Sequence, residues 1–146
     1  MYTIGEVSKM FDIPISTLRY YDKEGLLLGL EKNDSGIRKF TKQSLESLRV
    51  IECLKKTGMQ IKDIKEFMKW CLLGNETLKI RQDMFLKQKE VLQKEIKDLE
   101  QALDMVNFKC WYYEETIKTG SEEQIKNMKP EDMPKEVREL YEKSHS

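Results

Sequence analysis

The sequence is poor in several residue types, with a single histidine, three cysteines and three prolines among 146 residues. The histidine, His145, is the penultimate residue, which argues against histidine-based catalysis and histidine-rich metal sites. No apolar run approaches the roughly 18–20 residues of a membrane span, and the N-terminus has no apolar signal-peptide core. We therefore expect a cytoplasmic protein that contacts no membrane, with reduced thiols at Cys53, Cys71 and Cys110 and no disulfide framework.

An excess of charge of one sign is also missing. Lys+Arg and Asp+Glu each number 26, so the net charge is zero and gives no signal for nucleic acid. Residues 1–74 nevertheless carry three more basic than acidic residues, and residues 75–146 carry three fewer. This mild asymmetry permits a nucleic-acid-binding first half. The high charged fraction, 36%, favours helices with solvated faces over one large core.

Residues 16–26 predict a short helix around which the rest of the chain is organised. Ser16 is the expected N-cap, and Gly25 is the expected C′ residue because glycine enters the left-handed region without steric cost. Leu18 and Tyr21 supply the inward side. Hydroxyl and cationic donors suited to the DNA major groove occupy the remaining positions: Thr17, Arg19, Tyr20 and Lys23. An ordinary amphipathic helix with solvated charges is the alternative.

A helix-turn-helix is the expected setting of this stretch. The capping box Thr3-x-x-Glu6 opens a preceding helix, which should end near Asp12 because Pro14 disfavours helical geometry in the residue before it. Two short helices joined by three or four residues match the motif.

A small β-hairpin is predicted next, since the turn cluster at 33–36 lies between two short extended segments. Arg38 and Lys39 on its returning arm would contact phosphate or the minor groove, unless the segment is only an exposed loop. Two more helices follow, one from the Thr41 cap to about Lys56 and one over 61–74.

A long coiled-coil helix is predicted over residues 75–119, where apolar residues follow an a/d heptad without proline or glycine. One apolar seam on so long a helix pairs most economically with its own copy, so we expect a homodimer; an intramolecular hairpin is the competing arrangement. The expected interface residues are Leu92, Ile96, Leu99, Leu103, Val106 and Cys110. The polar tail, 120–146, is expected to hold a short amphipathic helix after Pro134.

In their order, these elements resemble the MerR family of bacterial transcriptional regulators. The motifs that carry the resemblance are YTIGEV at 2–7, TLRYYDKEGLL at 17–27 and GIRKFT at 36–41. The likeness covers roughly residues 1–117. It implies a mainly α fold, with a winged helix-turn-helix followed by the long dimerising helix. It also implies homodimers that bind near-palindromic promoter operators with an overlong spacer, and distort the DNA on effector binding so that RNA polymerase can use the promoter.

The resemblance also implies which residues contact double-stranded DNA. Contacts from the recognition helix and the wing are carried over to Thr17, Arg19, Tyr20, Arg38 and Lys39. Thr3 and Gly5 lie at the first helix N-terminus, which suits a phosphate. Ser16, Lys23 and Gly36 complete the candidate set.

The effector is the least determined part of the expected function. Residues 51–59 and 64–71 resemble the aldehyde- and electrophile-responsive branch, in which a single cysteine aligned with Cys53 is the proposed sensor. A thiolate attacks electrophiles, and neighbouring Lys55 or Lys56 would favour it; a buried small hydrophobe is the alternative. The metal-sensing branch typically carries paired cysteines after the long helix, and no cysteine follows Cys110, so no metal site is expected.

The sequence leaves two other functions open. Trp111, Tyr112 and Tyr113 with the tail would line a pocket for a lipophilic ligand, or the chain would be a coiled-coil adaptor whose first module binds protein. No nucleophile–base pair is visible, so we expect neither an enzyme nor a cofactor.

Overall fold

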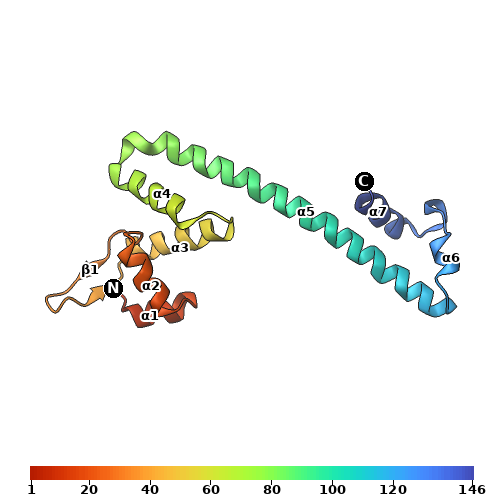
Figure 1. Ribbon diagram of the computed structural model, residues 1–146, viewed down its shortest axis with the longest axis horizontal. Helices are drawn as coiled ribbons and strands as arrows, with labels where there is room; N and C mark the ends of the chain where they lie inside the picture. Colours follow the sequence, from red (N-terminus) through yellow and green to blue (C-terminus); the bar gives the residue numbers. More distant parts are fainter. The chain divides into compact units, whose positions relative to one another are not determined.

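The computed structural model describes residues 1–146 and divides into two compact units, Met1–Gln88 and Lys89–Ser146. The fold is mainly α with one two-stranded hairpin, as predicted. None of its helices combines the length and the apolar character that crossing a membrane requires. The elements in chain order are α1 (Ile4–Phe11), α2 (Ile15–Lys23), β1 (Glu31–Lys32), β2 (Arg38–Lys39), α3 (Lys42–Lys56), α4 (Ile61–Leu73), the 3-10 turn η1 (Asn75–Thr77), α5 (Leu78–Thr119), α6 (Glu123–Lys126), η2 (Pro130–Asp132) and α7 (Lys135–Ser144) (Figure 1).

The helix-turn-helix is formed by α1 and α2. The predicted capping box opens α1: the Glu6 N–H donates to Thr3 Oγ1 at 3.1 Å, and the Thr3 N–H donates to Glu6 Oε1 at 3.2 Å. The helix ends at Phe11, and Asp12 adopts the left-handed conformation with φ of 53°. The expected end near Asp12 is therefore confirmed.

The predicted N-cap of α2 is wrong. The helix begins at Ile15, and Pro14 occupies the N-cap position without any side-chain cap. The Pro14 carbonyl accepts from the N–H groups of Thr17 and Leu18, at 3.0 and 3.2 Å. Since the proline ring already holds φ near the helical value, the helix starts before Ser16, whose hydroxyl lies in the first turn.

The C-terminal end of α2 is as predicted. Gly25 has a φ of 74°, and the Leu26 N–H reaches back to the Tyr21 carbonyl at 2.9 Å. This pattern satisfies carbonyls that the helix end would leave without partners. Leu18 and Tyr21 are both buried, as expected for the inward side.

The hairpin beside α2 confirms the predicted wing. Its strands are antiparallel, with Glu31 opposite Lys39. Asn33 Oδ1 shapes the turn by accepting from the N–H groups of Ser35 and Ile37, at 3.0 and 2.9 Å. An isolated bridge between Tyr2 and Phe40 ties the base of the hairpin to the start of the chain.

The core of the first unit lies where α1, α2, α3 and α4 meet. Each well-buried aliphatic side chain contributes about 1.5–3 kcal/mol relative to exposure. The most completely buried members are Val7, Leu18, Tyr21, Leu26, Phe40, Leu48, Ile51, Leu54 and Ile64. The hairpin, with two strands of two residues each, is too small to form a core of its own. The helices therefore position the wing.

A short elbow joins α4 to α5. Gly74, with φ of 86°, is followed by η1. The Arg81 Nη2 donates to the Gly74 carbonyl at 2.8 Å, and its Nε donates to Thr77 Oγ1 at 3.0 Å. Phe85 meets the ring of Phe67 edge-on, with centroids 5.4 Å apart. The first turns of α5 are therefore fixed on α4.

The second unit is the remainder of α5 with the tail folded against it (Figure 1). The predicted amphipathic tail helix is present as α7, and its Val137 is buried. Phe108 and Tyr112 of α5 form a cluster with Ile125, Met133 and Val137.

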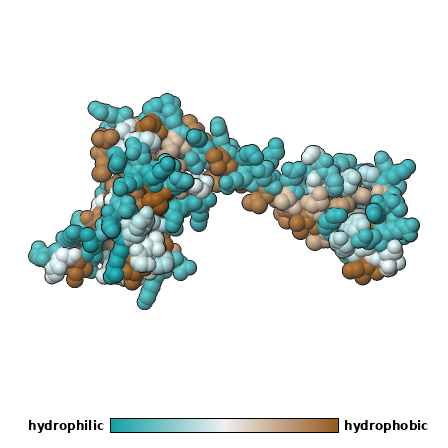
Figure 2. Space-filling view, viewed as in Figure 1, coloured by the Kyte–Doolittle hydropathy of each residue, from teal (hydrophilic) through white to brown (hydrophobic).

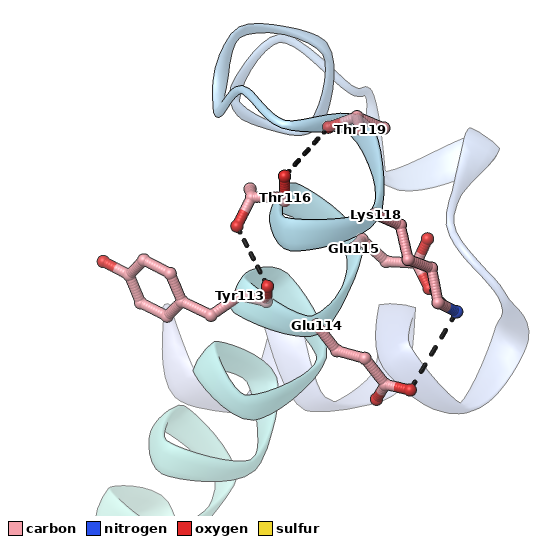
Figure 3. Close-up of polar contacts among 6 residues, drawn as sticks. All are labelled: Tyr113, Glu114, Glu115, Thr116, Lys118 and Thr119. Atoms are coloured by element: carbon pink, nitrogen blue, oxygen red, sulfur yellow. Dashed lines mark hydrogen bonds and ion pairs between the residues drawn. The ribbon is translucent and has the colours of Figure 1, made fainter.

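Polar contacts mark the last turns of α5 (Figure 3). The hydroxyl of Thr116 donates to the Tyr113 carbonyl at 3.0 Å, and that of Thr119 donates to the Thr116 carbonyl at 3.2 Å. Lys118 pairs with Glu115 at 3.2 Å. Each threonine hydroxyl thus donates to a carbonyl three residues earlier in the helix, and the Thr116 carbonyl also accepts from the Gly120 N–H at 2.8 Å.

Candidate DNA-binding interface

One face of α2 carries polar side chains that reach solvent. Ser16, Arg19, Tyr20 and Lys23 are exposed, at spacings of three, four and seven residues. Such spacing places them on one side of a helix. Thr17 lies at the edge of this face and is half-buried. We call these five residues the recognition face; the structure brings all the predicted candidates of α2 together on it.

A hydrogen-bonded anchor holds the opposite side of α2. The Tyr21 hydroxyl donates to Glu52 Oε1 at 2.8 Å and accepts from Lys55 Nζ at 2.6 Å. Burial raises the pKa of Tyr21 above its ordinary value of 10.0. The hydrogen bond to Tyr21 raises the pKa of Lys55. The phenol therefore stays protonated and the ammonium charged at neutral pH, which keeps the anchor intact.

An ion pair joins the wing to α2. Arg38 Nε contacts the carboxylate of Asp22, which lies on α2 between Tyr21 and Lys23. The pair connects β2 directly to the helix that carries the recognition face. Asp22 was not among the predicted site residues. Its motif position was visible in the sequence, but no local pattern shows that it meets an arginine sixteen residues away.

A cavity of about 250 Å³ lies between the start of α1, α2 and the wing. Thr3, Arg19 and Arg38, predicted from three separate segments, all line it, together with Asp22. Its apolar walls are Ile4, Leu18, Leu30, Ile37 and Phe40. The structure thus gathers the three predicted contact segments around one concave surface.

The first helix N-terminus is largely occupied by its own capping box. The N–H groups of Thr3 and Glu6 are both used within the box. Hydrogen bonds from Thr3 lower the pKa of Glu6, which is therefore ionised at neutral pH. A carboxylate beside this N-terminus weakens its attraction for a phosphate. Only the backbone N–H groups near Gly5 are then left to bind a phosphate at the predicted site.

Cys53 lies exposed on α3. The alternative of a buried small hydrophobe is therefore wrong for the single chain. Lys55, predicted to lie near the thiol, instead directs its ammonium to Tyr21. Cys53 directly follows Glu52, the residue that accepts the Tyr21 hydrogen bond.

The predicted heptad seam of α5 is solvent-exposed over most of its length. Leu99 is 70% exposed, and apolar atoms are visible in patches along this helix (Figure 2). Successive residues of a helix turn by about 100°, so Phe108 and Tyr112 point away from the seam. The tail packs on that opposite side. The exposed seam residues are Ile96, Leu99, Leu103, Val106, Cys110, Tyr113 and Ile117, and Leu92 is half-buried.

The three consecutive aromatics of α5 do not share a wall. Tyr112 is buried in the tail cluster, whereas Tyr113 is exposed on the seam side. Trp111 is half-buried and packs at the edge of the cluster. The structure also places no group of three histidine, cysteine or acidic side chains where they would hold a metal ion.

Comparison with known proteins agrees with this geometry. Residues 2–70 match the family model described as MerR HTH family regulatory protein. Over 120 residues the chain is 36% identical to an HTH-type transcriptional regulator of Haemophilus influenzae that carries the label uncharacterized, covering 82% of this chain and 89% of the relative.

Solved structures show the same likeness. The crystal structure of HiNmlR, described as a MerR family regulator lacking the sensor domain and bound to promoter DNA, has a TM-score of 0.75 at 35% identity, covering 84% of this chain and 98% of that one. A MerR family transcriptional regulator from Bacillus thuringiensis has a TM-score of 0.68 at 40% identity, covering 75% and 96% of the two chains. Fold, motifs and identity over four-fifths of its length agree, and the chain belongs to the MerR family of helix-turn-helix regulators, as a DNA-binding transcriptional regulator and not an enzyme.

Proposed function

We propose that the chain acts as a homodimer that binds a near-palindromic promoter operator, with one recognition face in each half-site. The observation that carries this proposal is the recognition face itself. Its exposed donors stand on a helix whose other side is fixed by Leu18 and by the Tyr21 anchor. A helix presented in this way suits the major groove, where side chains reach base edges.

The candidate residues divide into two kinds of contact. Arg19, Tyr20 and Thr17 stand where base edges would lie, and an arginine fork matches the two acceptors of guanine. Ser16, Lys23, Arg38 and Lys39 surround them and suit phosphates, which position the protein without reading sequence. Gly36 lets the backbone at the tip of the wing approach the duplex closely.

Dimerisation is supported by the exposed seam of α5. A row of large apolar side chains in water is unfavourable unless a partner covers it. The tail covers the opposite side of the same helix, so it does not fill the seam. The intramolecular hairpin therefore has no second helix to cover the seam, whereas a second copy of the chain supplies a matching seam by two-fold symmetry.

The dimer would regulate by deforming the operator. In the dimer, the two helix-turn-helix units with their wings are held at a fixed separation and favour a DNA shape that suits that separation. Deforming the DNA costs free energy, which the protein–DNA contacts must offset. An effector that shifts these units changes this balance and so changes whether RNA polymerase can use the promoter. RNA polymerase is thus the proposed partner at the promoter, and HiNmlR, which resembles this chain, is described as bound to promoter DNA.

For the effector, we favour an aldehyde or another small electrophile acting at Cys53. Its exposure leaves the thiol open to attack. In such a reaction the thiolate sulfur bonds to the carbonyl carbon, the C=O electron pair moves to oxygen, and that oxygen takes up a proton to give a hemithioacetal. The adduct would form beside Glu52 and so beside the anchor of the recognition helix.

Selection from a randomised duplex library, followed by titration of the enriched duplex and a scrambled one, tests the proposal. We expect the enriched duplex to bind more weakly as salt rises, because phosphate contacts release counterions. Arg19→Ala should weaken its binding about tenfold or more and reduce discrimination. Arg138→Ala, which removes the same charge from α7, is the matched control and should bind normally. Salt-independent binding, or binding that ignores Arg19→Ala, contradicts the proposal.

A further inference from the structure

The ion pair between Asp22 and Arg38 is the sole salt bridge between α2 and the wing. The arginine side chain is 45% exposed and that of the aspartate 23%. Asp22 comes three residues after Arg19 and one before Lys23, within the same two turns of helix. An acidic side chain beside a surface meant for phosphate repels DNA unless it does something else there.

The geometry of the pair leaves most of the arginine free. The contact is made by Nε, and the two terminal nitrogens of the guanidinium make no hydrogen bond to another residue of the chain. Those nitrogens carry four of the five guanidinium donors. Arg38 is therefore held by one edge while the rest of its fork remains available for a phosphate.

The wing has few other attachments. Its strands have two residues each, and a hairpin of this size is marginally stable alone. The Tyr2–Phe40 bridge and the bond from Thr41 Oγ1 to the Gly29 carbonyl, at 2.9 Å, fix only its base. Beyond that base, the contact with Asp22 is what links the returning arm to α2.

We propose that Asp22 is a positioning residue for DNA binding: it fixes the Arg38 guanidinium at a set distance from α2, so that recognition helix and wing engage one duplex together. The proposal rests on the proposed DNA contact of Arg38. Fixing the arm before binding spares the complex the entropic cost of ordering it. The repulsion between Asp22 and phosphate is the accompanying cost, and pairing with a cation reduces it.

The proposal makes Asp22 important for binding and unimportant for folding. Ion pairs with this much exposure contribute little to stability, so Asp22→Asn should unfold at the wild-type temperature. If Asp22 acted only through its charge, the same variant would bind every duplex more tightly, because one negative charge near phosphate is gone. Positioning and charge therefore predict opposite changes.

The test titrates the enriched duplex and its scrambled version with wild-type, Asp22→Asn, Asp22→Glu and Asp34→Asn proteins. Asp34→Asn removes the same charge from the exposed turn of the wing, where Asp34 has no salt bridge, and is the matched control. We expect Asp22→Asn to weaken binding of both duplexes, that of the enriched one about tenfold, and to reduce the salt slope by about one, because a phosphate contact is lost whatever the sequence. Asp22→Glu should restore most of the affinity.

The control should weaken binding of neither duplex, because it removes a negative charge without releasing Arg38. Wild-type affinity of Asp22→Asn for the enriched duplex would overturn the proposal, and so would tighter binding of both duplexes by that variant. Failure of Asp22→Glu to recover any affinity would also count against it.

Arg38→Gln separates this proposal from the one on which it rests. If Arg38→Gln binds like wild type, the DNA contact of Arg38 is refuted, and Asp22 has nothing to position. If Arg38→Gln weakens binding while Asp22→Asn does not, the contact stands and only the positioning role fails. With both roles intact, the double variant should bind no more weakly than Arg38→Gln alone, because the two residues act through one contact.

Discussion

The hydroxyl of Tyr21 donates a 2.8 Å hydrogen bond to the carboxylate of Glu52, which ties the recognition helix to α3 immediately before Cys53. The ammonium of Lys55 donates to the same hydroxyl at 2.6 Å. The phenol thus lies between a carboxylate and a cation, on the buried side of the helix whose exposed side presents Arg19 and Tyr20. Any change that moves α3 at this point acts directly on the recognition helix.

Replacing Tyr21 by phenylalanine should destabilise the first unit. The ring still fills its buried site, but Glu52 and Lys55 lose their shared partner and are left 4.0 Å apart. We expect the free energy of unfolding at pH 7 to fall by about 1–2 kcal/mol, measured by urea titration. Tyr20→Phe, at an exposed ring, should stay within about 0.5 kcal/mol of wild type; equal losses in both variants would contradict the role of the anchor.

The stability that the anchor supplies should depend on pH in the alkaline range. The pKa values of Tyr21 and Lys55 are both raised, from ordinary values of 10.0 and 10.5. A raised pKa means that the folded state holds the proton more tightly, so this stability is complete below about pH 10 and is lost as pH rises through the raised values. The difference between wild type and Tyr21→Phe should shrink above pH 10 in urea titrations from pH 7 to 11; a constant difference would assign it to packing alone.

The elements of the fold were predictable because their signals are local. A capping box spans four residues, the Gly25 end of α2 needs one glycine after an amphipathic turn, and the hairpin depends on the turn at 33–36. The heptad of α5 likewise repeats within seven residues. The prediction of Ser16 as N-cap failed for an equally local reason, since Pro14 had already fixed the start of the helix.

The missing parts of the site depend on contacts between distant residues. Asp22 meets Arg38 from another element, and Tyr21 meets Glu52 thirty-one residues away. Phe108 lies outside the a/d heptad, and its burial follows only from the way the tail folds back. No periodicity or helix cap encodes these pairings. The sequence therefore indicated the candidate side chains, but not which residues of other elements they contact.

Alanine substitutions at Gly29 and Gly36, two glycines with similar backbone conformations, should differ in their effect on stability. Gly29 and Gly36 have φ values of 76° and 77°, so alanine is strained at both. A Cβ at Gly36 would meet open space, whereas one at Gly29 would lie 2.8 Å from the Cβ of Gln43. We expect Gly36→Ala to cost about 1 kcal/mol and Gly29→Ala clearly more, by urea unfolding. If the second change Gln43→Gly recovers the extra stability lost in Gly29→Ala, the clash with Gln43 accounts for that extra loss.

Cys53→Ser should separate sensing from DNA binding. The exposed hydroxyl replaces an exposed thiol without disturbing the core, so the affinity for the enriched duplex should be unchanged. Transcription from a reporter promoter carrying that duplex should no longer respond to formaldehyde, because serine is not ionised at neutral pH. Cys71→Ala, at a half-buried thiol in α4, is the control and should keep the response. A Cys53→Ser protein that still responds would make Cys53 structural.

Leu99→Asp should break the proposed dimer. Leu99 is 70% exposed in one chain, so an aspartate there costs the monomer little, but across a two-fold seam it brings two carboxylates into an apolar contact. Sedimentation velocity at micromolar concentration should show a single chain, and the affinity for the enriched duplex should fall by about 10²–10⁴, because two half-sites are no longer linked. Gln93→Asp adds the same charge to an exposed position of α5 outside the seam and should remain dimeric. If Leu99→Asp sediments as wild type does, the exposed seam is not the surface through which the copies pair.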